Sequence, residues 1–253
     1  GTGAEATRNA VIGEPSRKFK ASLRSEHLLP RAAVVDPELG IDVPANVTAW
    51  SGMDALCQCI ESLTSTGANP MTDALAAKGV GLAARSLRRA VADGRDLAAR
   101  EGMAMAALIS GVTLTNAGLG AVHGFAAPVG ANFPVPHGAV CAALLAPVIA
   151  ANVAALSAAD PRHPALAKYA TVGRLLAGDE RLPDAEALSA AVDATASLTR
   201  DLNIPPLASF GMTPAAVPEM VALAKKASSM RFNPVVLSDA VLADVLVRAI
   251  GTP

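Results

Sequence analysis

A long uncharged segment limits what this chain can fold into more than any other feature. Residues 102–159 contain no Asp, Glu, Lys or Arg, yet they include His123 and His137. Polar groups inside an apolar interior need hydrogen-bonding or metal partners. The two histidines therefore predict a buried polar site within Ala121–Val140, with partners that come from elsewhere in the chain.

The same segment raises the question of a membrane span. Met103–Gly120 is about long enough to cross a bilayer. However, Ser, Thr and Asn side chains interrupt it, and neither basic boundaries nor aromatic belts flank it. We therefore expect a buried helix of a large bundle and no membrane partner.

The overall composition favours a helical protein that does not bind nucleic acid. Hydrophobic residues make up 52% of the chain and aromatic residues only 3%, and the abundant Ala and Leu are strong helix formers. The formal net charge of −1 gives no electrostatic footprint for nucleic acid. The three cysteines, an odd number, predict no disulfide framework and favour a reducing, cytoplasmic location.

The chain changes character near Pro44. Before it, three segments have strand patterns: Ala10–Ile12, which is followed by the turn signal Gly13-Glu14-Pro15, then Phe19–Leu23, and then Ala32–Val35. After it, the pattern is helical. We therefore expect a strand-rich part over residues 1–43 and an all-helical domain over residues 44–253, that is, a mainly α fold.

Helical periodicity and turn residues set the expected helices. They cover residues 51–64, 71–91, 97–117, 121–129, 136–153, 165–176, 184–202, 213–227 and 238–250. The first is expected to begin at Ser51 as N-cap, with Asp54 as the acidic partner of a capping box.

Four side chains suggest a metal site. Asp54 and Gln58 are four residues apart, so both project from one helix face. His123 and His137 lie on two segments that can fold back through the loop between them. A carboxylate, an amide oxygen and two imidazoles form a mixed oxygen and nitrogen donor set for a divalent cation. The alternative is that the histidines are hydrogen-bonded core residues and that Asp54 only favours the start of a helix.

Several motifs in order give the chain a family resemblance. They are Ser51–Glu61, Asn69-Pro70, Gly118–Gly124 and Pro136–Gly138, with Thr2–Thr7, Leu28–Pro30 and Asp36-Pro37 before them and Ser228–Arg231 and Asn233-Pro234 after them. In sequence and spacing they resemble the iron-containing (group III) alcohol dehydrogenase family across nearly the whole chain.

The resemblance implies a fold and an activity. The family has an α/β dinucleotide-binding domain followed by an all-helical domain, with the active site between them. This chain resembles the helical domain, preceded by the last strands of the first domain, so the family's Gly-rich pyrophosphate motif would lie before Gly1. The implied reaction is metal-dependent hydride transfer between a small-molecule alcohol (or an aldehyde or ketone) and NAD or NADP. A divalent metal, Fe²⁺ or Zn²⁺, and a homodimer or higher homo-oligomer are also implied.

The family's metal ligands fall on Asp54, Gln58, His123 and His137 of this sequence. Gln58 stands where the best-known members have His, and a neutral amide oxygen is a weaker ligand for Fe²⁺ or Zn²⁺ than imidazole. Ala127 stands where many members have a further His thought to help proton transfer. Proton transfer is then expected to use water, a ribose hydroxyl or another side chain.

The family's cofactor contacts fall on Thr2 and Gly3 in the opening turn, on Lys20 in the second strand and on Leu39 after Asp36-Pro37. Each also has a purely structural interpretation as a turn, strand or packing residue.

Two other functions stay open. The same fold could reduce carbonyls without a metal, with Gln58 and the histidines as hydrogen-bonding groups. Alternatively, the chain could be a non-catalytic helical fragment, either a truncated product or an assembly domain, which would bind neither NAD(H) nor NADP(H).

Overall fold

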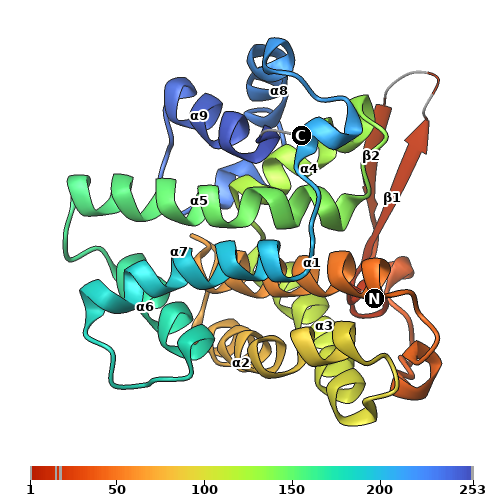
Figure 1. Ribbon diagram of the computed structural model, residues 1–253. Helices are drawn as coiled ribbons and strands as arrows, with labels where there is room; N and C mark the ends of the chain where they lie inside the picture. Colours follow the sequence, from red (N-terminus) through yellow and green to blue (C-terminus); the bar gives the residue numbers. More distant parts are fainter. Residues whose placement is uncertain (1, 15, 17–18, 252–253) are drawn as a thin grey trace.

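A short β-hairpin followed by a helical bundle makes up the part of the chain that the computed structural model describes, residues 2–14, 16 and 19–251 (Figure 1). The α-helices are α1 (Ala45–Thr64), α2 (Pro70–Ala92), α3 (Leu97–Ala117), α4 (Ala121–Asn132), α5 (His137–Ala159), α6 (Pro164–Ala177), α7 (Asp184–Asp201), α8 (Val217–Ala224) and α9 (Asp239–Ile250). Short 3-10 helices are η1 (Ala4–Ala6), η3 (Glu26–Leu28), η4 (Pro37–Gly40), η5 (Leu207–Phe210), η6 (Pro214–Ala216) and η7 (Met230–Phe232). The expected mainly α fold is confirmed.

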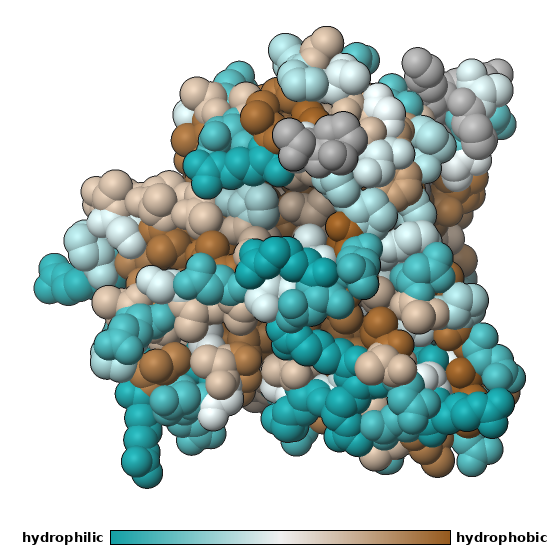
Figure 2. Space-filling view, viewed as in Figure 1, coloured by the Kyte–Doolittle hydropathy of each residue, from teal (hydrophilic) through white to brown (hydrophobic). Residues whose placement is uncertain are grey.

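Helix α5 lies in the middle of the bundle (Figure 1). It contacts α1, α6 and α7 on one side and α4 and α9 on the other, while α1 also packs on α2 and α3. On the face of the molecule drawn in Figure 2, hydrophilic side chains cover the lower part, around α2 and α3, and apolar side chains are visible beside α5. The middle of α1 is buried without a break from Gly52 to Thr64.

The uncharged segment forms most of α3 and all of α4 and α5. Among the described helices, α3 and α5 are long and apolar enough to cross a membrane. Within the bundle, however, 50% of the apolar window of α3 and 61% of that of α5 are buried. This burial is what the core helices of a bundle require.

The two earlier strand predictions are confirmed and the third is wrong. Strands β1 (Asn9–Glu14) and β2 (Phe19–Arg24) pair antiparallel, with Asn9 opposite Arg24. The predicted turn is wrong at Gly13 and Glu14, which lie within β1 because they pair with Lys20 and Phe19, and Pro15 lies outside the described residues. Residues 32–35 are extended without strand pairing, and Val34 is 91% exposed. An apolar run becomes a strand only where a neighbour accepts its hydrogen bonds, and no described residue does so here.

The expected start of the first helix is also wrong. Helix α1 begins at Ala45, after Pro44, so Ser51 is no N-cap and forms no capping box with Asp54. The Ser51 hydroxyl donates instead to the Val47 carbonyl, at 2.8 Å. Burial of residues 48 and 49 in the bundle explains the longer helix, because tertiary packing supplies most helix stability.

Asn69 caps α2 and provides a test of local stability. Its side chain accepts hydrogen bonds from the backbone of Met71 and Thr72, and the Thr72 hydroxyl accepts from the Asn69 backbone in return. We expect Asn69→Ala to lower the free energy of unfolding by about 1 kcal/mol, since two helix donors lose an acceptor. Urea denaturation measures it. Asn69→Ser, which keeps a capping oxygen, should be nearly neutral, and an equal loss in both variants would contradict the capping role.

Candidate metal centre

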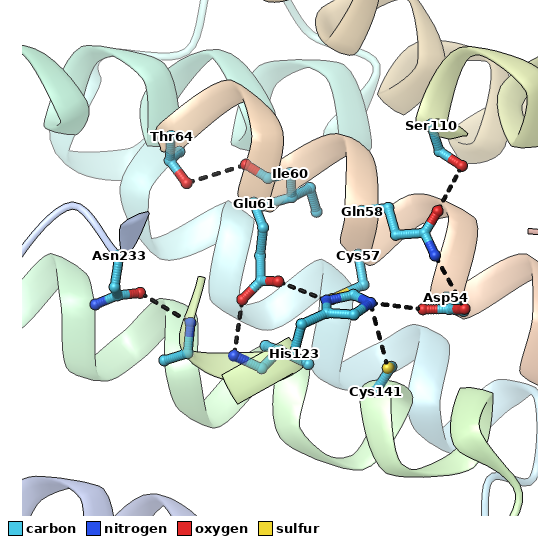
Figure 3. A network of polar contacts seen from close by, with 12 residues as sticks. Asp54, Cys57, Gln58, Ile60, Glu61, Thr64, Ser110, His123, Cys141 and Asn233 are labelled. Carbon is cyan, nitrogen blue, oxygen red and sulfur yellow. Dashed lines mark hydrogen bonds and ion pairs between the residues drawn. The ribbon is translucent and has the colours of Figure 1, made fainter. Parts of the chain in front are cut away.

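Three helices bring the polar side chains of the site together. Asp54 and Gln58 come from the buried middle of α1, and His123 lies in the first turn of α4. His137 is the first residue of α5, and Cys141 lies one turn further along the same helix. Figure 3 shows His123 pointing between Asp54, Glu61 and Cys141.

His123 is held between two buried carboxylates. Its Nδ1 lies 2.6 Å from Glu61 Oε2, and its Nε2 lies 3.1 Å from Asp54 Oδ1. The other oxygen of Glu61 accepts the Val122 backbone N–H at 2.7 Å. A carboxylate at one imidazole nitrogen fixes the proton there and turns the other nitrogen toward a metal. Glu61 therefore directs Nε2 of His123 toward the centre of the cluster.

The α5 side chains complete the cluster. Nε2 of His137 lies 3.7 Å from Asp54 Oδ2. Sγ of Cys141 lies 3.8 Å from Nε2 of His123 and 3.7 Å from Nε2 of His137. The ligand atoms of Asp54, His123, His137 and Cys141 all lie within 4.8 Å of one another.

Gln58 is close to this cluster, but both ends of its amide have partners. Nε2 donates to Asp54 Oδ2 at 3.1 Å, and Oε1 accepts from the Ser110 hydroxyl at 2.8 Å. The Ser110 oxygen also lies 2.7 Å from the Ala107 carbonyl. Gln58 thus links the carboxylate of Asp54 to Ser110 of α3 through hydrogen bonds and holds the carboxylate in position.

Burial and close contacts shift the titration of these groups. Burial alone raises the pKa of Asp54, but the hydrogen bond from His123 and the charges of His137 and His123 outweigh it and hold the pKa below its usual value. Burial lowers the pKa of His123, but its contacts with Cys141, Asp54 and Glu61 outweigh burial and raise the pKa well above the usual value. Burial raises the pKa of the Cys141 thiol, as does its contact with Cys57.

The donor set fits a divalent metal. Asp54 has no exposed surface, and a buried carboxylate is costly unless cations or hydrogen-bond donors surround it. One carboxylate, two imidazole nitrogens and one sulfur face a common point, a combination that suits Zn²⁺ or Fe²⁺ and not Mg²⁺ or Ca²⁺.

The residues predicted to contact the cofactor all precede α1 in the chain. Gly3 adopts a φ of 75° and packs against the backbone of α3, where a Cβ would lie 2.1 Å from the Ala107 carbonyl oxygen. Thr2 beside it is half-buried. Lys20 lies in β2, but its side chain is outside the described part of the structure. Leu39 is 82% exposed and lines a cleft of about 280 Å³ between η4, α1 and α3.

Glu61 and Cys141 are the site residues that the sequence analysis missed. Glu61 lies seven residues after Asp54, which is the spacing of one helix face over two turns. Cys141 lies four residues after His137, again on one face. Once the helices and their buried faces are known, helical spacing therefore places both residues on the same face as a predicted ligand.

Comparison with known proteins identifies the family. The family model for the Fe-containing alcohol dehydrogenase family, C-terminal, matches residues 48–250. The chain belongs to this family.

Relatives of this chain include enzymes named as alcohol or diol dehydrogenases. 1,3-Propanediol dehydrogenase of Klebsiella pneumoniae is 39% identical over 238 residues, 92% of this chain and 59% of the relative. NAD-dependent methanol dehydrogenase of Bacillus methanolicus is 42% identical over 151 residues, 60% of this chain and 39% of the relative. A crystal structure of 1,3-propanediol oxidoreductase superposes with a TM-score of 0.89 at 36% identity, covering 98% of this chain and 63% of that one. The chain thus spans about three-fifths of the length of 1,3-propanediol dehydrogenase.

Proposed function

We propose that this chain supplies the metal- and substrate-binding part of an NAD(P)-dependent alcohol dehydrogenase, which transfers hydride between a small alcohol and the corresponding aldehyde or ketone. The observation that supports it is the convergence of Asp54, His123 and His137 from three helices on one buried point. Membership of a family of alcohol dehydrogenases supports the reaction type.

The residues of the site have separate tasks in this proposal. A bound Fe²⁺ or Zn²⁺ would supply Lewis-acid polarisation of the substrate oxygen, and the nicotinamide would supply or accept the hydride. Asp54 and His123 form the buried floor, with side chains 1% and 8% exposed, and keep water from it. The side chain of His137 is 39% exposed. Substrate therefore reaches the centre from the His137 side.

The cofactor and the assembly follow from the family resemblance. Thr2, Gly3, Lys20 and Leu39 are the proposed NAD(P) contacts. The cleft beside Leu39 supports a nucleotide near η4. A homodimer or higher homo-oligomer and a cytoplasmic location are part of the same proposal.

Metal analysis of the purified chain tests the proposal. We expect about one Fe²⁺ or Zn²⁺ per chain after anaerobic reconstitution, because the donor set is complete within the chain. Calorimetry with NAD(H) and NADP(H) tests the nucleotide separately. Nucleotide binding without metal would favour the metal-free carbonyl reductase, and binding of neither would favour the non-catalytic fragment.

A further inference from the structure

Cys141 occupies a position that the family resemblance does not assign to the metal. It has no exposed surface. Its sulfur lies 3.8 Å from Nε2 of His123 and 3.7 Å from Nε2 of His137, on the side where both nitrogens approach Asp54. A buried sulfur that contacts the two metal-facing nitrogens is placed as a donor to the same ion.

The distances match those between ligands of one tetrahedral ion. Zinc–nitrogen bonds of about 2.0–2.1 Å and zinc–sulfur bonds of about 2.3 Å place nitrogen and sulfur roughly 3.6 Å apart at a tetrahedral angle. The two sulfur–nitrogen distances exceed this by only one or two tenths of an ångström. The 3.1 Å between His123 Nε2 and Asp54 Oδ1 is close to the roughly 3.3 Å expected of a nitrogen and an oxygen on one ion.

Gln58 does not compete for this position. Its amide nitrogen, and not its oxygen, faces Asp54, and its oxygen accepts the Ser110 hydroxyl. For Gln58 to bind a metal, the amide would have to turn and exchange both partners. Cys141 needs no such rearrangement, because its sulfur already faces both imidazoles.

We propose that Cys141 is the fourth protein ligand of the metal, together with Asp54, His123 and His137, and that Gln58 acts outside this set by positioning Asp54. This inference rests on the proposed function insofar as that function places a metal here. The thiol would bind as thiolate, and its proton would pass to solvent. A sulfur donor makes the site softer, which favours Zn²⁺ over Fe²⁺. Substrate would approach such a metal from the His137 side, where the side chain is 39% exposed.

Cobalt substitution tests the ligand directly. Co²⁺ bound through a thiolate has an intense charge-transfer band in the near ultraviolet, and Co²⁺ bound only through oxygen and nitrogen does not. We expect this band in the reconstituted chain and its loss in Cys141→Ser. The Zn²⁺ affinity of Cys141→Ser should also fall by more than about 100-fold, because even residues that only hold a ligand in place change metal affinity by about 10–100-fold. The matched control is Cys59→Ser. Cys59 is equally buried, but its sulfur faces the carbonyl oxygen of Ala106 on α3, at 3.9 Å.

Each outcome decides between the proposals. Loss of the band in Cys141→Ser alone supports Cys141 as ligand. Stoichiometric Co²⁺ without a thiolate band, or a band that persists in Cys141→Ser, overturns the inference and leaves the proposed function standing. No metal in the parent chain overturns both. X-ray absorption of the Zn²⁺-loaded parent needs no variant: a sulfur neighbour at about 2.3 Å supports the proposal, and oxygen and nitrogen alone refute it.

Discussion

Replacing His123 by Ala is expected to abolish metal binding and to lower the free energy of unfolding of the metal-free chain by about 3–5 kcal/mol. His123 lies between Asp54 and Glu61 and contacts both carboxylates. Asp54 is 0% exposed and Glu61 is 6% exposed. Without the imidazole, both carboxylates lose a close partner in an interior that cannot solvate them. Elemental analysis measures the metal, and urea denaturation in the presence of a chelator measures the stability.

His137→Ala is the matched control. His137 is a proposed ligand as well, but its side chain is 39% exposed and lies 3.7 Å from Asp54. We expect this variant to lose the metal too, while its metal-free stability changes by less than about 1 kcal/mol. Metal retained in His123→Ala would contradict the site. Equal destabilisation in the two variants would contradict the role given to the two carboxylates.

Adding a single methyl group at Gly138 is expected to disturb the site without touching a ligand. A Cβ there would lie 2.3 Å from the carbonyl oxygen of Trp50, so α1 and α5 would have to separate. Asp54 lies on α1, while His137 and Cys141 lie on α5. We therefore expect Gly138→Ala to lower the free energy of unfolding by about 1–3 kcal/mol. Metal affinity should fall at least about tenfold, because the donors are pulled apart.

The same substitution at Gly13 controls for the chemical change. A Cβ at Gly13 has nothing within 4 Å. Gly13→Ala should leave the metal affinity unchanged, and its free energy of unfolding should stay within about 0.5 kcal/mol of that of the parent chain. Competition with a chromophoric chelator measures affinity in both variants. Parent-like affinity in Gly138→Ala would show that the helices can separate there without moving the donors.

Local signals predicted the helices where caps and turn residues mark their ends. Helix α3 was predicted over residues 97–117 and is found there, because Asp96 caps its start and Gly118, with a φ of 80°, ends it. Where tertiary contacts decide, the prediction failed. The early start of α1 depends on the burial of residues 48 and 49, and the apolar run at residues 32–35 has no described partner strand.

The site was predictable in its residue types but not in its atomic contacts. The motifs singled out Asp54, His123 and His137, and the structure brings them together. Which amide atom of Gln58 faces Asp54 depends on Ser110 across the α1–α3 interface. That Cys141 faces both histidines depends on how α5 packs against α1 and α4. Such contacts come from helix packing, and sequence periodicity alone cannot supply them.

The three-helix origin of the donors has a consequence for the lifetime of the protein in a cell. Asp54 and His123 are 69 positions apart along the chain, so an ion between them would join distant segments as a removable cross-link. Binding to the folded form alone would add about 4 kcal/mol of stability at a free metal concentration a thousand times the dissociation constant. Metal starvation would then expose the chain to proteases, so that metal supply would control how much of the protein persists.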